Sequence, residues 1–113
     1  MTDCIFCRIA AGSLPATIVH RDEHVLAFHD AAPQAPTHIL IIPMRHISSA
    51  AQLTEADSDL AGRLITTAAR VAQEAGLRGG YRLVINTGRH GGQSVDHLHV
   101  HILGGRAMRW PPG

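Results

Sequence analysis

Three histidines alternate with aliphatic residues near the end of this 113-residue chain, at His97, His99 and His101. Side chains on a β-strand point alternately to its two faces, so a strand over residues 97–103 places all three imidazoles on one face. We expect the aliphatic residues between them to pack on the core and the imidazoles to face a cleft or solvent. Histidine serves as nucleophile, acid, base or metal ligand near neutral pH, so this face is the first candidate for chemistry.

Three interpretations of the histidine face stay open. The imidazoles decorate a solvent-exposed surface, or they form a three-histidine metal site, or they act on a small anionic group. The metal site lacks a carboxylate partner, because alternation places the only acid of the segment, Asp96, on the face opposite His97. A phosphate is favoured by the glycine-rich loop over residues 87–94, whose backbone N–H groups and Ser94 hydroxyl are suitable donors.

The two cysteines of the chain, Cys4 and Cys7, form a Cys-x-x-Cys pair. A disulfide is not expected in a cytosolic chain, and a thioredoxin-like redox pair requires a preceding strand in a βαβ unit. Zinc requires two further ligands, for which His46 and His97 are our candidates. The alternative is a pair of buried thiols. The zinc interpretation predicts a Cys2His2 site that joins the N-terminal helix, a loop and the last strand.

Composition limits the classes of function. With 45% hydrophobic and 17% charged residues, the chain buries a core, and its length predicts a single domain over residues 1–113. A formal charge of +1 argues against a broad electrostatic interaction with nucleic acid or a membrane surface. No apolar run approaches the ~20 residues of a membrane span, and the first ten residues lack a signal-peptide core, so we expect a cytoplasmic protein.

The remaining pattern predicts an α+β fold with an antiparallel sheet. We expect strands over residues 17–21, 25–28, 38–43, 81–86 and 97–103, a short helix over 3–11 capped by Asp3, and a long helix over 55–75 capped by Thr54. His38 begins the third strand and is expected to reach the histidine face. Asp30, at the end of the second strand, is either a ribose-binding carboxylate or a turn residue.

The motif over residues 97–103, His-φ-His-φ-His-φ-φ, resembles that of the histidine triad (HIT) superfamily, in particular its Hint branch of nucleotide-binding proteins. Other segments resemble that branch in the same order: residues 27–30, 33–38, 42–48, 80–82, 91–95, 104–106 and 110–113. The resemblance covers nearly the whole chain, and this set of motifs is specific.

The resemblance implies a HIT-like fold: a five-stranded antiparallel sheet with one long and one short helix. It also implies a homodimer that joins two sheets, with the tail over residues 104–113 reaching the partner. The implied activity is hydrolysis of the P–N bond of purine nucleoside phosphoramidates, of AMP or GMP type, through a nucleotidyl-histidine intermediate. The implied zinc is structural, and no cofactor is needed for catalysis. The alternatives are a dinucleoside polyphosphate hydrolase and a nucleotide-binding adaptor whose hydrolysis is incidental.

The resemblance also assigns residues. It makes His99 the nucleophile and places His101 beside the α-phosphate. Further nucleotide-binding residues are, on the phosphate side, Ser94, Asn86, Gly92 and Gln93; at the ribose, Asp30; around the base, Phe6, Ile9, Leu14, Phe28 and Ala31; and from the other subunit, Trp110. The set Cys4, Cys7, His46 and His97 resembles a zinc site of bacterial-type members.

Two positions depart from the family pattern. Asp96 precedes His97 where relatives often carry a bulky apolar or aromatic residue, which questions the local packing of His97. Ala31 is smaller than the branched residue common at its position, which predicts a wider slot for the base.

Overall fold

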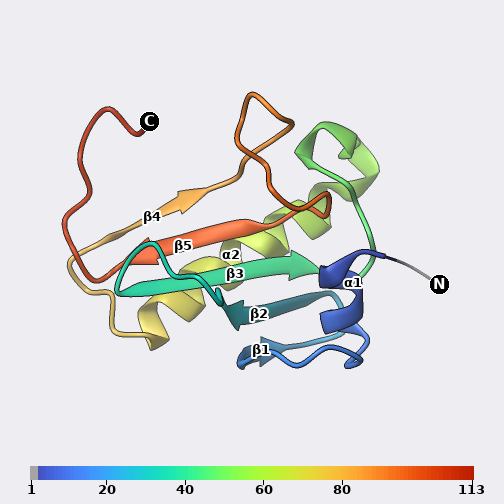
Figure 1. Ribbon diagram of the computed structural model, residues 1–113, viewed down its shortest axis with the longest axis horizontal. Helices are drawn as coiled ribbons and strands as arrows, with labels where there is room; N and C mark the ends of the chain where they lie inside the picture. The colour runs from blue at the N-terminus through green and yellow to red at the C-terminus, as the bar shows by residue number, and fades with distance from the viewer. Residues whose placement is uncertain (1–2) are drawn as a thin grey trace.

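The five strands form one antiparallel sheet in the order β1-β2-β3-β5-β4 (Figure 1). The computed structural model describes residues 3–113. Within them the strands are β1 Ile18–Arg21, β2 Val25–His29, β3 Thr37–Pro43, β4 Tyr81–Val84 and β5 Val100–Gly104. The five-stranded antiparallel sheet expected from the sequence is confirmed, and β3 and β5 lie side by side at its centre.

Two helices of unequal length flank this sheet. The short helix α1 is Ile5–Ala10 and the long helix α2 is Ser58–Glu74. The 3-10 turns η1, Ala50–Gln52, and η2, Glu55–Asp57, precede α2. As Figure 1 shows, α2 lies along one face of the sheet, whereas α1 lies at the end of β3 near the N-terminus. Across residues 3–113 we find no helix that combines the length and the apolar character needed to cross a membrane.

Each face of the sheet has its own apolar layer, because side chains alternate along the strands. On the α2 face, a cluster of buried residues joins the helix to three strands, β2, β3 and β5: Val25, Ala27, Ile39, Ile41, Ile47, Leu64, Ala68, Val71, Ala72, Leu98, Val100 and Ile102. On the other face, residues of α1 pack on β2 and β3: Phe6, Ile9, Ala10, Leu26, Phe28, Leu40 and Ile42. The histidine face of β5 belongs to this second layer.

Both helix starts differ from the sequence-based expectation. The N-cap of α1 is Cys4 rather than Asp3, and the Cys4 sulfur accepts a hydrogen bond from the Cys7 backbone N–H at 3.3 Å. The long helix was expected over residues 55–75, but its first three residues form the turn η2. There the Asp57 carboxylate accepts from the Thr54 backbone N–H at 3.0 Å, and the Asp57 N–H donates three residues back, to the Thr54 carbonyl.

The last strand begins at Val100, three residues later than expected. The pairing of β5 with β3 ends at Val100 and Ile41, because the preceding chain turns toward another segment, where the Leu98 N–H donates to the Ile47 carbonyl at 2.6 Å. The fourth strand likewise ends at Val84 rather than at residue 86. His97 and His99 thus lie in an irregular segment, a fact that matters for the site.

Candidate functional site

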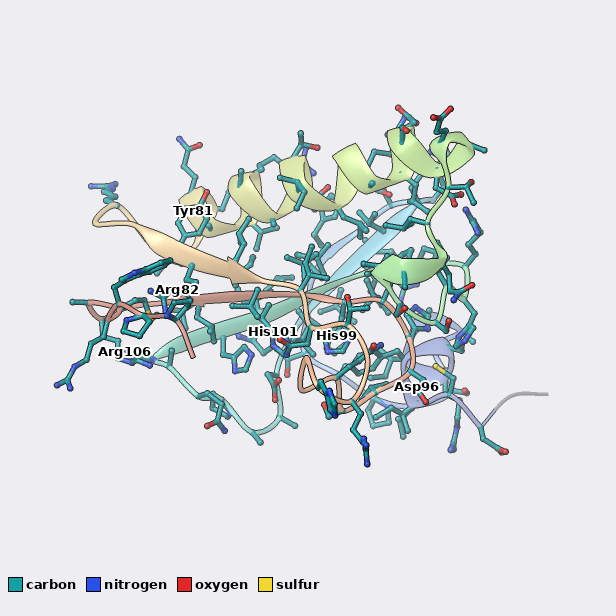
Figure 2. All side chains as sticks on the ribbon, turned by 90° about the horizontal axis from the view of Figure 1, so that it is seen from above. Tyr81, Arg82, Asp96, His99, His101 and Arg106 are labelled. Carbon is teal, nitrogen blue, oxygen red and sulfur yellow. The ribbon has the colours of Figure 1, made fainter. Side chains whose placement is uncertain are left out.

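The histidines lie on the face of the sheet opposite α2, and α1 covers part of that face. Figure 2 shows His99 and His101 on the far side of β5 from the long helix. The Phe6 ring stands edge-on to the His97 and His99 rings, with centroids 5.9 and 5.2 Å away. His97 is 0% and His99 is 3% exposed. The shared face is confirmed, and its burial excludes an interpretation as surface decoration.

A cavity of about 540 Å³ opens beside these rings, a volume typical of small-molecule sites. Most of the nucleotide-binding residues expected from the sequence line it: Phe6, Ile9, Leu14, Phe28, Asp30, Ala31, Ser94, His99 and His101. The wall also contains residues that were not expected: Ile5, Pro15, Ala16, Thr17, His29, Leu40 and Val95. Of these, Leu40 had a signal in the sequence, since it stands two positions after His38 on a strand and so shares its face.

The other expected nucleotide-binding residues lie outside this cavity wall: Asn86, Gly92, Gln93 and Trp110. Asn86 follows β4 and is half-buried. The Gln93 amide accepts from the Gly88 N–H at 2.9 Å and donates to the Ser48 carbonyl at 2.7 Å, so this side chain shapes the loop over residues 87–94. Trp110 is 82% exposed. Contacts of these four residues with a nucleotide stay predictions.

Two glycines of this loop are required by the conformation of the chain. A Cβ atom at Gly91 would lie 2.3 Å from the Thr87 carbonyl oxygen. Gly92 has open space around it but a φ of +83°, which favours glycine. The glycine-rich composition, read from the sequence as a phosphate cradle, therefore has a conformational cause at both positions.

The hydrogen bond of His99 determines which of its nitrogens is available. Its Nδ1 lies 2.7 Å from the His97 carbonyl oxygen. A carbonyl oxygen only accepts, so Nδ1 carries the proton and donates. In the neutral ring Nε2 then keeps its lone pair. His99 lines the cavity, and the arrangement suits nucleophilic attack by Nε2 on an electrophile bound there.

A second chain of hydrogen bonds fixes the proton positions in His38 and His101. The Gln34 backbone N–H donates to His38 Nδ1 at 3.0 Å, so the proton of neutral His38 is on Nε2. That Nε2 lies 2.8 Å from His101 Nδ1, which must accept. The proton of neutral His101 is therefore on its Nε2, a buried atom without a hydrogen-bond partner among residues 3–113. The His101 ring lines the cavity and thus has an unpaired Nε2–H donor.

Burial keeps both rings neutral at pH 7. Desolvation, together with the neighbouring His99 and His38, lowers the pKa of His101 to about 4. Desolvation also lowers the pKa of His38, although the Asp30 carboxylate acts in the opposite direction. An anion bound beside His101 would oppose the same desolvation, since an opposite charge favours the protonated ring.

Asp30 both lines the cavity and closes a turn. One carboxylate oxygen accepts from the Ala32 N–H at 2.8 Å, and the other lies 3.4 Å from His38 Nε2. Asp30, His38 and His101 lie close enough to be considered as a metal site. They do not fit one, because His38 uses its Nδ1 lone pair for the Gln34 N–H and holds a proton on Nε2. We interpret the group as a hydrogen-bond network.

The expected zinc ligands Cys4, Cys7, His46 and His97 do come together, with donor atoms within 4.8 Å of one another. His97 Nδ1 lies 3.3 Å from Cys4 Sγ, 3.5 Å from Cys7 Sγ and 3.2 Å from His46 Nδ1. A tetrahedral zinc site with bonds of about 2.0–2.3 Å has donors roughly 3.3–3.8 Å apart, so the spacing fits the metal.

The proton position of His97 also fits a metal ligand. Its Nε2 lies 3.0 Å from the Pro43 carbonyl oxygen, to which it donates, so the Nδ1 lone pair faces the two sulfurs and His46. A carbonyl that holds the other nitrogen of a ligating histidine is the usual arrangement in metal sites. Desolvation lowers the pKa of His97, which keeps the ring neutral and able to bind a cation.

Asp96 does not point away from this cluster, as strand alternation predicted. It is exposed, and it lines a second cavity of about 490 Å³ together with Cys4, His46 and Ser94. The prediction was wrong because Asp96 and His97 precede β5, where alternation does not apply. His97 is completely buried, so an acid at the preceding position does not disturb its packing.

Comparisons with known proteins agree with this site. Residues 11–108 match the family model described as HIT domain. An uncharacterized HIT-like protein of Synechococcus elongatus is 50% identical over 111 residues, which are 98% of this chain and 97% of that protein. A 14 kDa zinc-binding protein of Brassica juncea is 48% identical, over 98% of this chain and 100% of its own length. The crystal structure of a HIT family hydrolase from Legionella pneumophila superposes with a TM-score of 0.96 at 51% identity, covering 98% of this chain and 100% of that one.

Proposed function

The chain belongs to the HIT family, and we propose that it hydrolyses purine nucleoside phosphoramidates with His99 as the covalent nucleophile. One observation carries the proposal: the His97 carbonyl holds His99 Nδ1–H at 2.7 Å, which leaves Nε2 as the lone-pair nitrogen of a ring that lines the cavity. The similar Legionella protein is described as a hydrolase, which supports hydrolytic chemistry.

In the first step, His99 Nε2 attacks phosphorus and the P–N bond to the amine breaks. The His97 carbonyl stabilises the positive charge that develops on the ring, because it accepts the Nδ1 proton throughout. The Nε2–H of neutral His101 donates a hydrogen bond to an oxygen of the anionic phosphate, and the departing amine nitrogen takes a proton from a water molecule, which leaves a hydroxide ion. His101 keeps its proton on Nε2, and the nucleotide is bound to His99.

In the second step, water attacks phosphorus and the bond to His99 Nε2 breaks. The proton lost by this water neutralises the hydroxide left by the first step, and His99 recovers its lone pair. Ser94, which lines the cavity, donates its hydroxyl to a phosphate oxygen in this proposal. Two easier displacements thereby replace one difficult hydrolysis.

The remaining parts of a nucleotide have places in the same cavity. The apolar side chains of Phe6, Ile9 and Phe28 form a slot for a purine, and the Asp30 carboxylate is available to the ribose hydroxyls. A zinc ion held by Cys4, Cys7, His46 and His97 would supply a structural cross-link between α1 and the chain before β5. No step of the reaction passes through it.

The C-terminal tail supports a homodimer. Figures 1 and 2 show the tail, with Arg106, at the end of the sheet opposite α1. Trp110 is 82% exposed, so it covers no surface of its own chain. In the proposed dimer this tail reaches toward the cavity of the other subunit. The preference for a purine and for a substrate of AMP or GMP type is also part of this proposal.

The test compares turnover of an aminoacyl adenosine phosphoramidate with turnover of a diadenosine polyphosphate. We expect the phosphoramidate to be preferred and His99→Ala to lose roughly 10⁴-fold or more in kcat. His90→Ala, an exposed histidine outside the cavity, is the matched control. A labelled nucleotide trapped on His99 would support the covalent intermediate.

Three results would contradict the proposal. A His99→Ala variant with most of the wild-type rate would exclude His99 as the nucleophile. Preference for the diadenosine compound would favour a dinucleoside polyphosphate hydrolase. Nucleotide binding without any turnover would favour an adaptor.

A further inference from the structure

One residue, His97, belongs to both the cysteine–histidine cluster and the nucleophile's support. Its ring Nδ1 faces Cys4 and Cys7, at 3.3 and 3.5 Å from their sulfurs. Its backbone carbonyl accepts the Nδ1 proton of His99 at 2.7 Å. The position of the His97 ring and the position of the carbonyl that orients His99 are consequently linked through a single residue.

The segment that carries this carbonyl is held by two hydrogen bonds and by the cluster. The segment before Val100 has left the sheet, so no ladder with β3 fixes it. Its anchors are the Leu98 N–H bonded to the Ile47 carbonyl at 2.6 Å and the His97 ring bonded to the Pro43 carbonyl at 3.0 Å. The cluster is the third anchor, and it sets the orientation of the ring from the other side.

The cluster also holds a wall of the cavity. Cys4 caps α1 and Cys7 lies within it, while Ile5, Phe6 and Ile9 of the same six-residue helix line the cavity. So short a helix does not form alone in water and depends on its tertiary contacts. Phe6 in addition packs edge-on to the His97 and His99 rings.

We propose that a metal ion in the cluster positions His99 and the purine slot, so that metal and nucleotide bind cooperatively, with His97 as a positioning residue. The four donors lie within 4.8 Å of one another, a spacing at which one tetrahedral zinc ion would bind all four and connect α1, the loop with His46 and the segment before β5. Loss of the metal therefore loosens α1 and the His97 carbonyl together. The nucleotide half of this inference rests on the proposed function.

The first test uses the unmodified protein. The affinity for Zn²⁺ is measured by competition with a chelator, with and without saturating AMP. Coupling between two sites is reciprocal and typically corresponds to about 5- to 150-fold in affinity, so we expect AMP to tighten zinc binding at least fivefold. Zinc affinities that agree within twofold would overturn the proposal.

The second test uses two substitutions of one ligand outside the main cavity wall. His46→Ala removes a donor, whereas His46→Cys keeps four donors. We expect the His99 ring, followed by its ¹⁵N chemical shifts, to lose its single Nδ1–H tautomer in His46→Ala and to keep it in zinc-loaded His46→Cys. The dissociation constant for AMP should rise at least fivefold in the first variant and stay within twofold of wild type in the second.

Val71→Ala, on the buried face of α2, is the stability control. This control should lower the melting temperature without changing the His99 tautomer or the affinity for AMP. If Val71→Ala changes the tautomer and the AMP affinity as much as His46→Ala does, the metal has only a structural role and the proposal is wrong. If His46→Ala does not fold, the zinc competition on the wild type decides. The His99 tautomer is measured without nucleotide. If the protein does not bind AMP, the proposed function is contradicted, but the tautomer comparison still tests whether the metal positions His99.

Discussion

His38 donates from Nε2 to His101 Nδ1 across 2.8 Å, and this contact determines which nitrogen of His101 carries the proton. The Gln34 N–H on the opposite nitrogen of His38 excludes the reverse arrangement in the neutral pair. A backbone amide on the loop before β3 thus sets, through two rings, the N–H that His101 contributes at the cavity. The motif over residues 97–103 alone contains no sign of this dependence.

The first prediction separates the donor function of His38 from its bulk. His38→Leu removes the donor and leaves buried His101 Nδ1 without a partner, which costs about 1–3 kcal/mol, or roughly 10- to 100-fold in kcat. His38→Gln retains an amide N–H and should lose less than tenfold. Steady-state kinetics on a nucleoside phosphoramidate measure both. Identical losses in the two variants would show that the donated hydrogen bond is unimportant.

The second prediction concerns stability at acid pH. The pKa of His101 is about 4 in the folded protein and near 6.5 in an unfolded chain, so the unfolded chain binds more protons here between these values. The stability that neutral His101 contributes is complete above pH 6.5 and is lost as the pH falls toward 4. We expect His101→Phe to lose less stability than wild type between pH 7 and pH 4.5, measured by urea unfolding.

Asp22 provides the control for this window. Its hydrogen bond with His20 is the largest cause that lowers the pKa of its carboxyl to about 2. Its contribution is therefore present above the ordinary pKa of 3.8 and is lost only below that value, as the pH falls toward 2. Asp22→Asn should leave the slope between pH 7 and pH 4.5 unchanged. Parallel curves for wild type and His101→Phe would contradict the assignment to His101.

The fold could be predicted largely because its signals are local. Val100 and Ile102 alternate with histidine, and this period of two correctly separated the α2 face from the histidine face. The same rule failed at Asp96, because the chain there is no longer part of the sheet and the Leu98 N–H bonds the Ile47 carbonyl. These two residues are about fifty positions apart in the sequence, so no local pattern contains this contact. For this reason the sequence predicted the start of β5 and the direction of the Asp96 side chain incorrectly.

The sequence indicated the residues that could do chemistry at the site, but it did not indicate all the residues that line the cavity. The candidate zinc ligands and the proposed nucleophile have characteristic residue types and spacing, so the sequence alone was enough to propose them, and the structure brings the four candidate ligands together. Ala16 and Thr17 line the cavity although nothing in their types indicates it, because they follow the turn after α1 and are placed there by packing. Gly91, part of the loop interpreted as a phosphate-binding segment, is required by its closeness to the Thr87 carbonyl.

The third prediction follows from these glycines. Gly92→Ala meets no atoms and adds only the cost of a left-handed backbone, about 1–2 kcal/mol. Gly91→Ala places Cβ 2.3 Å from a backbone oxygen that cannot move without its loop, so we expect a larger loss, roughly 2–3 kcal/mol or more. Thermal unfolding compares the two variants. A smaller loss for Gly91→Ala than for Gly92→Ala would show that the loop adapts.

The fourth prediction is the number of metal ions. Residues 3–113 contain two groups of close ligand-type residues. Of these two, the cysteine–histidine cluster offers lone pairs toward its centre, whereas in the other group His38 presents a proton to Asp30 and His101. We expect one tightly bound zinc per chain by elemental analysis after dialysis. Cys7→Ser should weaken zinc binding and lower the melting temperature, because ligand binding to the native state stabilises it. Asp30→Asn should retain one zinc, and a second equivalent that disappears in this variant would show that the hydrogen-bond network also binds metal.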